Sequence, residues 1–284
     1  PQDYPIDSLI ELRDTIDPND PEGAAAVELF YSAFFVTYAT DLKAGRLTPQ
    51  KVDPKLFRGR KTVDPLEVLT ELTDANNPND FLTAFESKNP HYQSLKKILA
   101  LYRALEESYA WPTIATGVDI KEGMSDPRIP QIRQLLTMTG DFPGGGAGSE
   151  LYDSETVLAV RSFQMRHGLE AKGLIGKQTI LALNVPPAER VRQISLNMER
   201  WRWMPEDLGE HHFMVNLAAF ELQEVEQEQL VDRMDVVVGA VATSTPEFSD
   251  DMEYVEINPT WTVPYSIATS EMLPKLRRNP SAYA

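Results

Sequence analysis

The sequence predicts an α+β protein of several domains, with helices in its first two thirds and strands in its last third. Before Pro205, apolar residues recur at spacings of three and four in several segments, as on the buried face of a helix. After Pro205 that period gives way to short runs typical of strands. The chain has 284 residues, 42% of them hydrophobic, so it can bury the cores of two or three domains.

The first 122 residues are expected to form an all-helical domain. One apolar stripe ends at Gly45, a residue type that often follows the end of a helix. Asp64-Pro65 suits the start of a second helix, because Asp accepts hydrogen bonds from free backbone N–H groups and Pro fits the first helical position. A third stripe runs from residue 91 to residue 108.

Residues 123–186 are expected to form a small domain of three helices. Asp153 is placed to cap the second of these helices, and residues 177–183 can form the third. Residues 187–284 are expected to hold a linker helix and the first part of a β-rich domain. The strands expected there cover residues 213–217, 220–225, 234–238, 254–257 and 261–263.

The composition excludes several functions. The chain has 27 basic and 43 acidic residues, a net charge of −16, which argues against nucleic acid because phosphate binding needs a basic surface. No segment approaches the roughly 20 apolar residues that span a bilayer, so no transmembrane helix is expected. The chain starts at Pro1 without a charged and then apolar leader, so we expect any export signal to lie outside it. It has no cysteine, which excludes disulfides, thiolate zinc sites and a thiol nucleophile within these residues.

No catalytic constellation can be assembled from the residue types alone. The sequence has no glycine-rich phosphate loop, no His-Glu-x-x-His and no Gly-x-Ser-x-Gly. His211 and His212 are adjacent, so in a strand they point to opposite faces, which argues against joint metal ligation. Asp250-Asp251 is expected to lie in a turn rather than to bind a cation. We predict no metal site.

A dense set of motifs lies between residues 126 and 184. They are Ile132–Leu136, Gly140-Asp141, Tyr152-Asp153, Val160–Gln164, Arg166–Leu169, Gly173–Thr179 and Leu183-Asn184. This set resembles the small three-helix peptidoglycan-binding domain. The resemblance implies a shallow polar groove that holds a glycan strand or a stem peptide. Tyr152, Gln164 and His167 are the candidate substrate-binding residues, with packing in the core or capping of the glycine turn as their alternative roles.

A second set of motifs follows in the last third. They are Gln193–Trp203, Val238-Gly239, Thr245–Ser249, Ile257–Ala268 and Leu273–Leu276. They resemble the catalytic domain of large periplasmic L,D-transpeptidases. The helical front, including Tyr38–Gly45, resembles the scaffold of that family, and the domain order agrees, so the resemblance covers nearly the whole chain.

The resemblance implies a cysteine enzyme that needs no cofactor. A thiolate attacks a stem peptide, expels its terminal D-alanine and passes the acyl group to an amine of a second stem, giving a 3→3 cross-link. The family's Ser-His-Gly-Cys motif is absent here, so we carry over no catalytic residue and expect the motif beyond Ala284. The chain as given is therefore expected to be inactive. Trp261 and Tyr265 are expected at the entrance to the substrate channel, with core packing as the alternative.

The resemblance also implies partners and a location. The partners are peptidoglycan stem peptides and glycan strands, with other cell-wall synthesis proteins as further candidates. The location is the periplasm. Two alternatives stay open at this point: a non-catalytic peptidoglycan-binding module that scaffolds a cell-wall partner, and a zinc hydrolase with the same binding domain. The sequence disfavours the hydrolase, because no cluster of metal ligands is visible in it.

Overall fold

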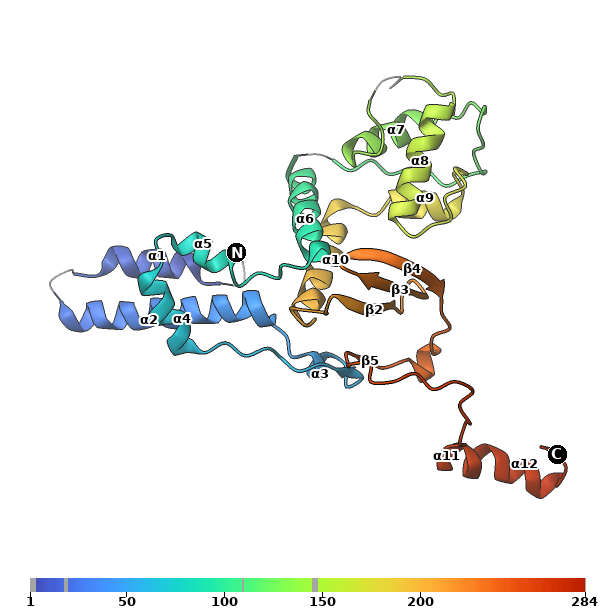
Figure 1. The fold of residues 1–284 in the computed structure, drawn as a ribbon. Coiled ribbons are helices and arrows are strands. Elements are labelled where there is room, and N and C mark those ends of the chain that lie inside the picture. The colour runs from blue at the N-terminus through green and yellow to red at the C-terminus, as the bar shows by residue number, and fades with distance from the viewer. Residues whose placement is uncertain (1–3, 18–19, 109, 145–147, 284) are drawn as a thin grey trace. The chain divides into compact units, whose positions relative to one another are not determined.

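The computed structural model describes residues 4–17, 20–108, 110–144 and 148–283 (Figure 1). The chain divides into two units, which meet between Phe248 and Ser249 in the sequence. Helices occupy most of the first 202 residues, and a small antiparallel sheet follows them. This confirms the predicted α+β class. Within the described ranges, no helix has the length and apolar character needed to cross a bilayer.

Helices predominate among the described residues up to Ser108, as predicted. The helices are α1 (Ile6–Thr15), α2 (Pro21–Ala44), α3 (Pro49–Val52), α4 (Pro65–Asp74), α5 (Pro78–Thr83) and α6 (Pro90–Ser108). The carboxylate of Asp64 accepts a hydrogen bond from the backbone N–H of Leu66 at 2.8 Å, so the predicted cap of α4 is confirmed. Helices α1, α3 and α5 were not predicted.

Helix α2 ends at Gly45 because only glycine fits there. Its φ of +79° lies in the left-handed region, and its N–H donates to the carbonyl of Asp41 at 3.2 Å. A Cβ at this position would lie 2.5 Å from Oε1 of Glu199 and 2.9 Å from Nε1 of Trp203. A side chain would therefore disturb the junction between α2 and the helix that carries Glu199.

We expect Gly45→Ala to lower the thermal midpoint by roughly 2–8 °C. The left-handed backbone costs about 1–2 kcal/mol for a residue with a Cβ, and the clash with Glu199 adds to it. Thermal unfolding followed by far-UV circular dichroism measures the shift. Gly59→Ala is the matched control, because a Cβ on Gly59 meets no heavy atom within 4 Å. Equal midpoints for the two variants would contradict the claim that position 45 requires glycine.

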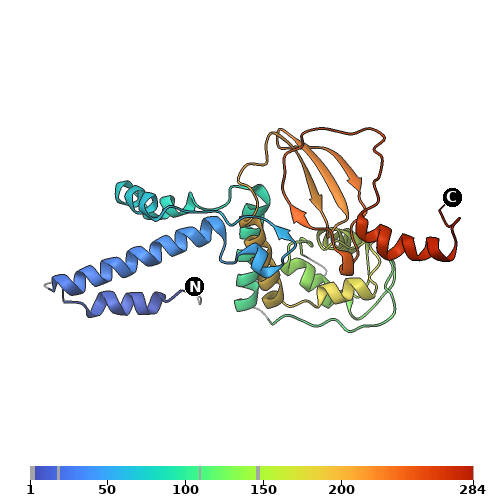
Figure 2. The same ribbon diagram turned by 90° about the horizontal axis from the view of Figure 1, so that it is seen from below.

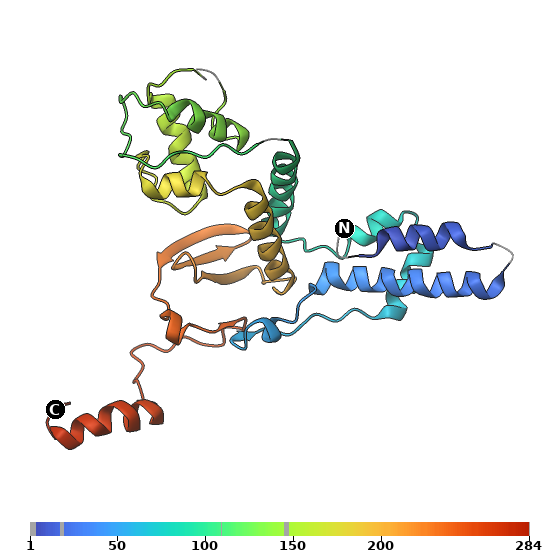
Figure 3. The same cartoon turned by 180° about the vertical axis from the view of Figure 1, so that it is seen from behind.

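Helix α10 (Pro187–Arg202) lies side by side with α6 (Figures 1 and 3). The two helices share a buried cluster made of Tyr92, Leu99, Tyr102, Leu105, Ile194 and Met198. At one end of the cluster, Nη2 of Arg202 donates to the hydroxyl of Tyr92 at 3.0 Å. The ring of His91 stacks on Trp201 with the centroids 5.1 Å apart. This packing joins the helical front to the segment that leads into the sheet.

The sheet contains β2 (His211–Asn216), β3 (Glu221–Glu226) and β4 (Gln229–Asp235), paired antiparallel in the order β2-β3-β4 (Figure 2). The strands predicted at 213–217 and 220–225 are confirmed to within two residues, whereas the strand predicted at 234–238 overlaps only the end of β4. A separate parallel pair joins β1 (Leu56–Phe57) to β5 (Glu247–Phe248).

The strands predicted at 254–257 and 261–263 are wrong. Both segments are irregular, and Tyr254, Ile257 and Trp261 are 77%, 85% and 71% exposed. Aromatic and β-branched residues form a strand only where a neighbouring strand can hydrogen-bond to them. Within the described residues, no strand pairs with these two segments. A continuous helical segment then follows, made of α11 (Tyr265–Ile267), a π-helical stretch η2 (Ala268–Met272) and α12 (Leu273–Arg278).

Candidate functional site

Helices α7 (Ile129–Met138), α8 (Ser154–Arg166) and α9 (Lys177–Leu183) form a small unit with its own core. All three coincide with predicted helices, and Asp153 accepts from the N–H of Thr156 at 2.9 Å as the predicted cap of α8. Ile114 and Ile120, which precede the predicted boundary at residue 123, also pack in this core. Its described hydrophobic residues with no exposed surface are Ile120, Ile129, Ile132, Leu135, Leu136, Tyr152, Val160 and Ile175.

The guanidinium of Arg133, 2% exposed, fixes the chain before α8. Its Nη1 donates to the carbonyl of Ser149 at 2.6 Å, and its Nη2 donates to the carbonyl of Leu151 at 2.7 Å. Nε donates to the hydroxyl of Thr156, and Nη2 also contacts Asp153, both at 2.8 Å. Hydrogen bonds from Thr156, with a smaller effect of Arg133, hold the pKa of Asp153 below its usual range.

Tyr152 and Gln164 hold the glycine turn that precedes α9. The hydroxyl of Tyr152 donates to the carbonyl of Gly173 at 2.5 Å, and Oε1 of Gln164 accepts from the Gly173 N–H at 2.9 Å. Nε2 of Gln164 donates to the carbonyl of Leu174 at 2.8 Å and to the hydroxyl of Thr179 at 2.9 Å. Tyr152 and Gln164 are 0% and 2% exposed. The structure therefore gives both their alternative roles, with Tyr152 packed in the core and Gln164 capping the glycine turn, and both are buried away from solvent.

A groove of about 490 Å³ opens beside this turn, where the end of α8, α9 and the start of α10 meet. It combines positive charge with an apolar wall. The residues that line it are Arg166, His167, Leu169, Gln178, Leu181, Ala182, Val185 and Arg190. We call it the α8–α10 groove. His167 is the predicted binding residue that the structure places in it.

His167 presents a neutral ring to the α8–α10 groove. The ring stacks on Phe163 at a centroid distance of 4.0 Å, and Nδ1 lies 2.8 Å from the Phe163 carbonyl. Because a carbonyl can only accept, Nδ1 carries the proton, which leaves Nε2 as an acceptor. Burial lowers the pKa of His167, and the nearby Arg190 and Arg166 lower it further.

Two guanidiniums line the groove, and the charge of one of them is compensated by a carboxylate. Arg166 binds the buried carboxylate of Asp141 through Nε, at 2.9 Å, and through Nη2. Arg190 donates to the carbonyl of Ala182 and to Oε1 of Gln193, both at 3.0 Å. Burial lowers the pKa of Arg190, yet an arginine stays charged at neutral pH. Such a groove suits a small ligand that carries a carboxylate and methyl-sized apolar groups.

Trp261 and Tyr265 lie in the second unit and form no part of this groove. Trp261 belongs to the irregular segment and Tyr265 begins α11, with 71% and 85% of their surface exposed. Their contact with a substrate stays a prediction. The sequence reasoning missed Arg190, which lies on a different helix and 24 positions after Arg166, because no local spacing connects the two.

Comparisons with known protein families match three parts of the chain. Residues 1–99 match a family described as "Scaffold domain", residues 125–183 match "Putative peptidoglycan binding domain", and residues 210–284 match "L,D-transpeptidase catalytic domain". A curated relative from Haemophilus influenzae, "Putative L,D-transpeptidase", is 26% identical over 110 residues. That alignment covers 37% of this chain and only 22% of the relative.

Proposed function

We propose, from the premise that this chain belongs to the L,D-transpeptidase family, that its three-helix domain binds peptidoglycan for an acyl-transfer enzyme. The α8–α10 groove is the observation that carries the binding half of the proposal. Peptidoglycan stem peptides carry free carboxylates and alanine methyl groups. Arg190, whose guanidinium donates to neutral oxygens, offers a cation to the carboxylates, and Leu181 and Val185 offer an apolar wall to the methyl groups.

We expect Arg190→Gln to weaken binding to purified sacculi by about tenfold, because one charge-assisted contact in a partly buried groove is lost. Cosedimentation of the protein with sacculi at several protein concentrations measures the affinity. Arg192→Gln is the matched control, because Arg192 lies on the same helix and its side chain is 73% exposed. If both variants bind as well as the parent protein, the groove is not the binding site.

The catalytic half of the proposal is transfer of an acyl group between stem peptides. A cysteine thiolate attacks the carbonyl that precedes the terminal D-alanine, forms a thioester and releases the D-alanine. An amine of a second stem then attacks the thioester, which forms a 3→3 cross-link and returns the thiol. The 284 residues contain no cysteine, so we place the nucleophile in chain outside them. In this proposal Trp261 and Tyr265 line the entrance to the substrate channel.

The intact mass of the natural protein tests the catalytic half without affecting the binding half. We expect a mass well above the 32.0 kDa of these 284 residues, with a cysteine in the additional chain. A natural protein of 32.0 kDa that binds sacculi but releases no D-alanine would instead be a non-catalytic module that scaffolds other cell-wall synthesis proteins. Either version binds peptidoglycan, so we propose the periplasm as the location of the protein.

A further inference from the structure

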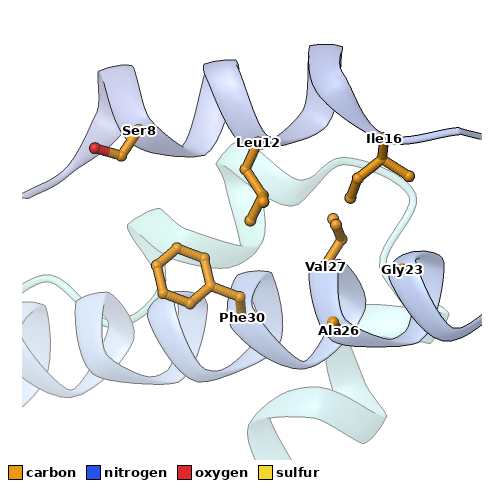
Figure 4. Close-up of a pocket in the computed structure, with 7 residues that line it drawn as sticks. All are labelled: Ser8, Leu12, Ile16, Gly23, Ala26, Val27 and Phe30. Atoms are coloured by element: carbon orange, nitrogen blue, oxygen red, sulfur yellow. The ribbon is translucent and has the colours of Figure 1, made fainter.

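Helices α1 and α2 enclose an apolar groove of about 510 Å³ (Figure 4). We call it the tip groove, and it is lined by Ser8, Leu12, Ile16, Gly23, Ala26, Val27 and Phe30. In Figure 4, Leu12 of α1 and Ile16, which follows α1, point toward Val27 and Phe30 of α2. The lining residues are spaced by three and four on each helix, so they form one stripe on each.

The fold itself holds the tip groove open. The hydroxyl of Tyr31 donates to the carbonyl of Leu9 at 2.7 Å and ties α2 to α1. Small side chains at Gly23 and Ala26 leave space between the helices. Phe30 remains 44% exposed at one end of the groove. An apolar hollow of this size, with large side chains still open to solvent, is typical of an interaction site.

The charge around the tip groove is strongly negative. Glu11 lies three positions after Ser8 and Glu22 lies four positions before Ala26, so an exposed carboxylate neighbours a lining residue on each helix. Arg13 is the one basic side chain in residues 4–17 and 20–31, and its Nε binds Asp14 at 2.8 Å. The exposed acidic residues of α1, α2 and the α2 cap are Asp7, Glu11, Asp14, Asp20, Glu22 and Glu28.

We infer that the tip groove docks an amphipathic helix of a partner protein, with apolar residues against the groove and Lys or Arg on its flanks. The stripe from Ser8 to Ile16 is about 12 Å long, which matches two turns of a docked helix with anchors at i, i+4 and i+7. Charge complementarity selects this occupant. A second copy would bring two acidic rims together, and an anionic bilayer would repel the same carboxylates.

The test is binding of two fluorescent helical peptides to the full 284-residue chain, measured by anisotropy. Both peptides carry leucine at i, i+4 and i+7, and their flanking positions are lysine in one and glutamate in the other. We expect the lysine peptide to bind at least about tenfold more tightly, because only its flanks complement Glu11 and Glu22. Equal affinities, or no binding of either peptide, would overturn the inference.

Matched variants locate the bound peptide. Ala26→Gln fills the tip groove with a neutral side chain and should weaken the lysine peptide about tenfold. Ala25→Gln, at an exposed neighbouring position outside the groove, should leave its affinity unchanged. Circular dichroism checks that both variants fold alike. If the two variants bind equally, the peptide lies elsewhere and the inference fails.

A second pair of variants tests the role of the carboxylates beside the groove, and two further measurements test other possible occupants. Glu11→Gln combined with Glu22→Gln should weaken the lysine peptide, whereas Glu67→Gln combined with Glu71→Gln on α4 should not. Light scattering that shows a dimer of the parent chain, lost in Ala26→Gln, would instead assign the groove to a second copy. Binding to phosphatidylglycerol vesicles that Ala26→Gln abolishes would assign it to a membrane. Either result overturns the proposed partner helix.

Discussion

Replacing Arg133 by methionine is expected to destabilise the three-helix domain by about 3–5 kcal/mol. Methionine fills a similar volume but donates no hydrogen bond. Four oxygens would each lose the hydrogen bond that Arg133 donates: the carbonyls of Ser149 and Leu151, the hydroxyl of Thr156 and the carboxylate of Asp153. These contacts position the N-terminus of α8, so we expect the loss to spread through that helix rather than stay at one site.

Hydrogen exchange with mass spectrometry measures this effect, because it reports the opening of α7 and α8 separately from the rest of the chain. We expect protection in residues 129–166 to fall by a factor of about 10² or more. Gln134→Met, at an exposed position on the same helix, is the matched control and should leave protection unchanged. Unchanged exchange in both variants would show that the buried guanidinium contributes little to stability.

Glu199→Ala is expected to loosen the junction between the helical front and α10, at a cost of about 3–5 kcal/mol. Oε1 of Glu199 accepts from the N–H of Leu47 at 2.9 Å and from Nε1 of Trp203 at 3.2 Å, and Oε2 pairs with Arg202 at 3.2 Å. The residue is only 7% exposed. Alanine would leave two N–H groups without an acceptor and Arg202 without its carboxylate.

Two further variants separate the contribution of the hydrogen bonds from that of the charge. Glu199→Gln keeps an oxygen for Leu47 and Trp203, so it should recover part of the lost stability. Asn197→Ala, at an exposed position on the same helix, should cost almost nothing. Hydrogen exchange in residues 41–60 and 187–203 provides the measurement. If exchange rises only around Trp203, Glu199 stabilises α10 alone and does not join it to the segment around Leu47 that follows α2.

Much of the local structure followed from the sequence. Asp64 and Asp153 cap helices because their side chains reach backbone N–H groups two or three residues away, which is a local property. Gly45 ends α2 for a similarly local reason, its left-handed backbone. The apolar spacing of three and four residues located α2, α6 and the helices of the middle domain. Strands were harder to predict, because residues 254–263 have the composition of a strand but no partner within the described chain.

The sequence by itself determined the class of the fold, the main helices and the family resemblance, because periodicity, caps and short motifs are written in neighbouring residues. The tertiary structure decided which side chains meet. It turned Tyr152 and Gln164 inward, brought Arg190 beside His167, and joined Glu199 to Leu47 across 152 positions of the chain. Contacts of that kind depend on how whole helices pack, and no spacing along the sequence encodes them.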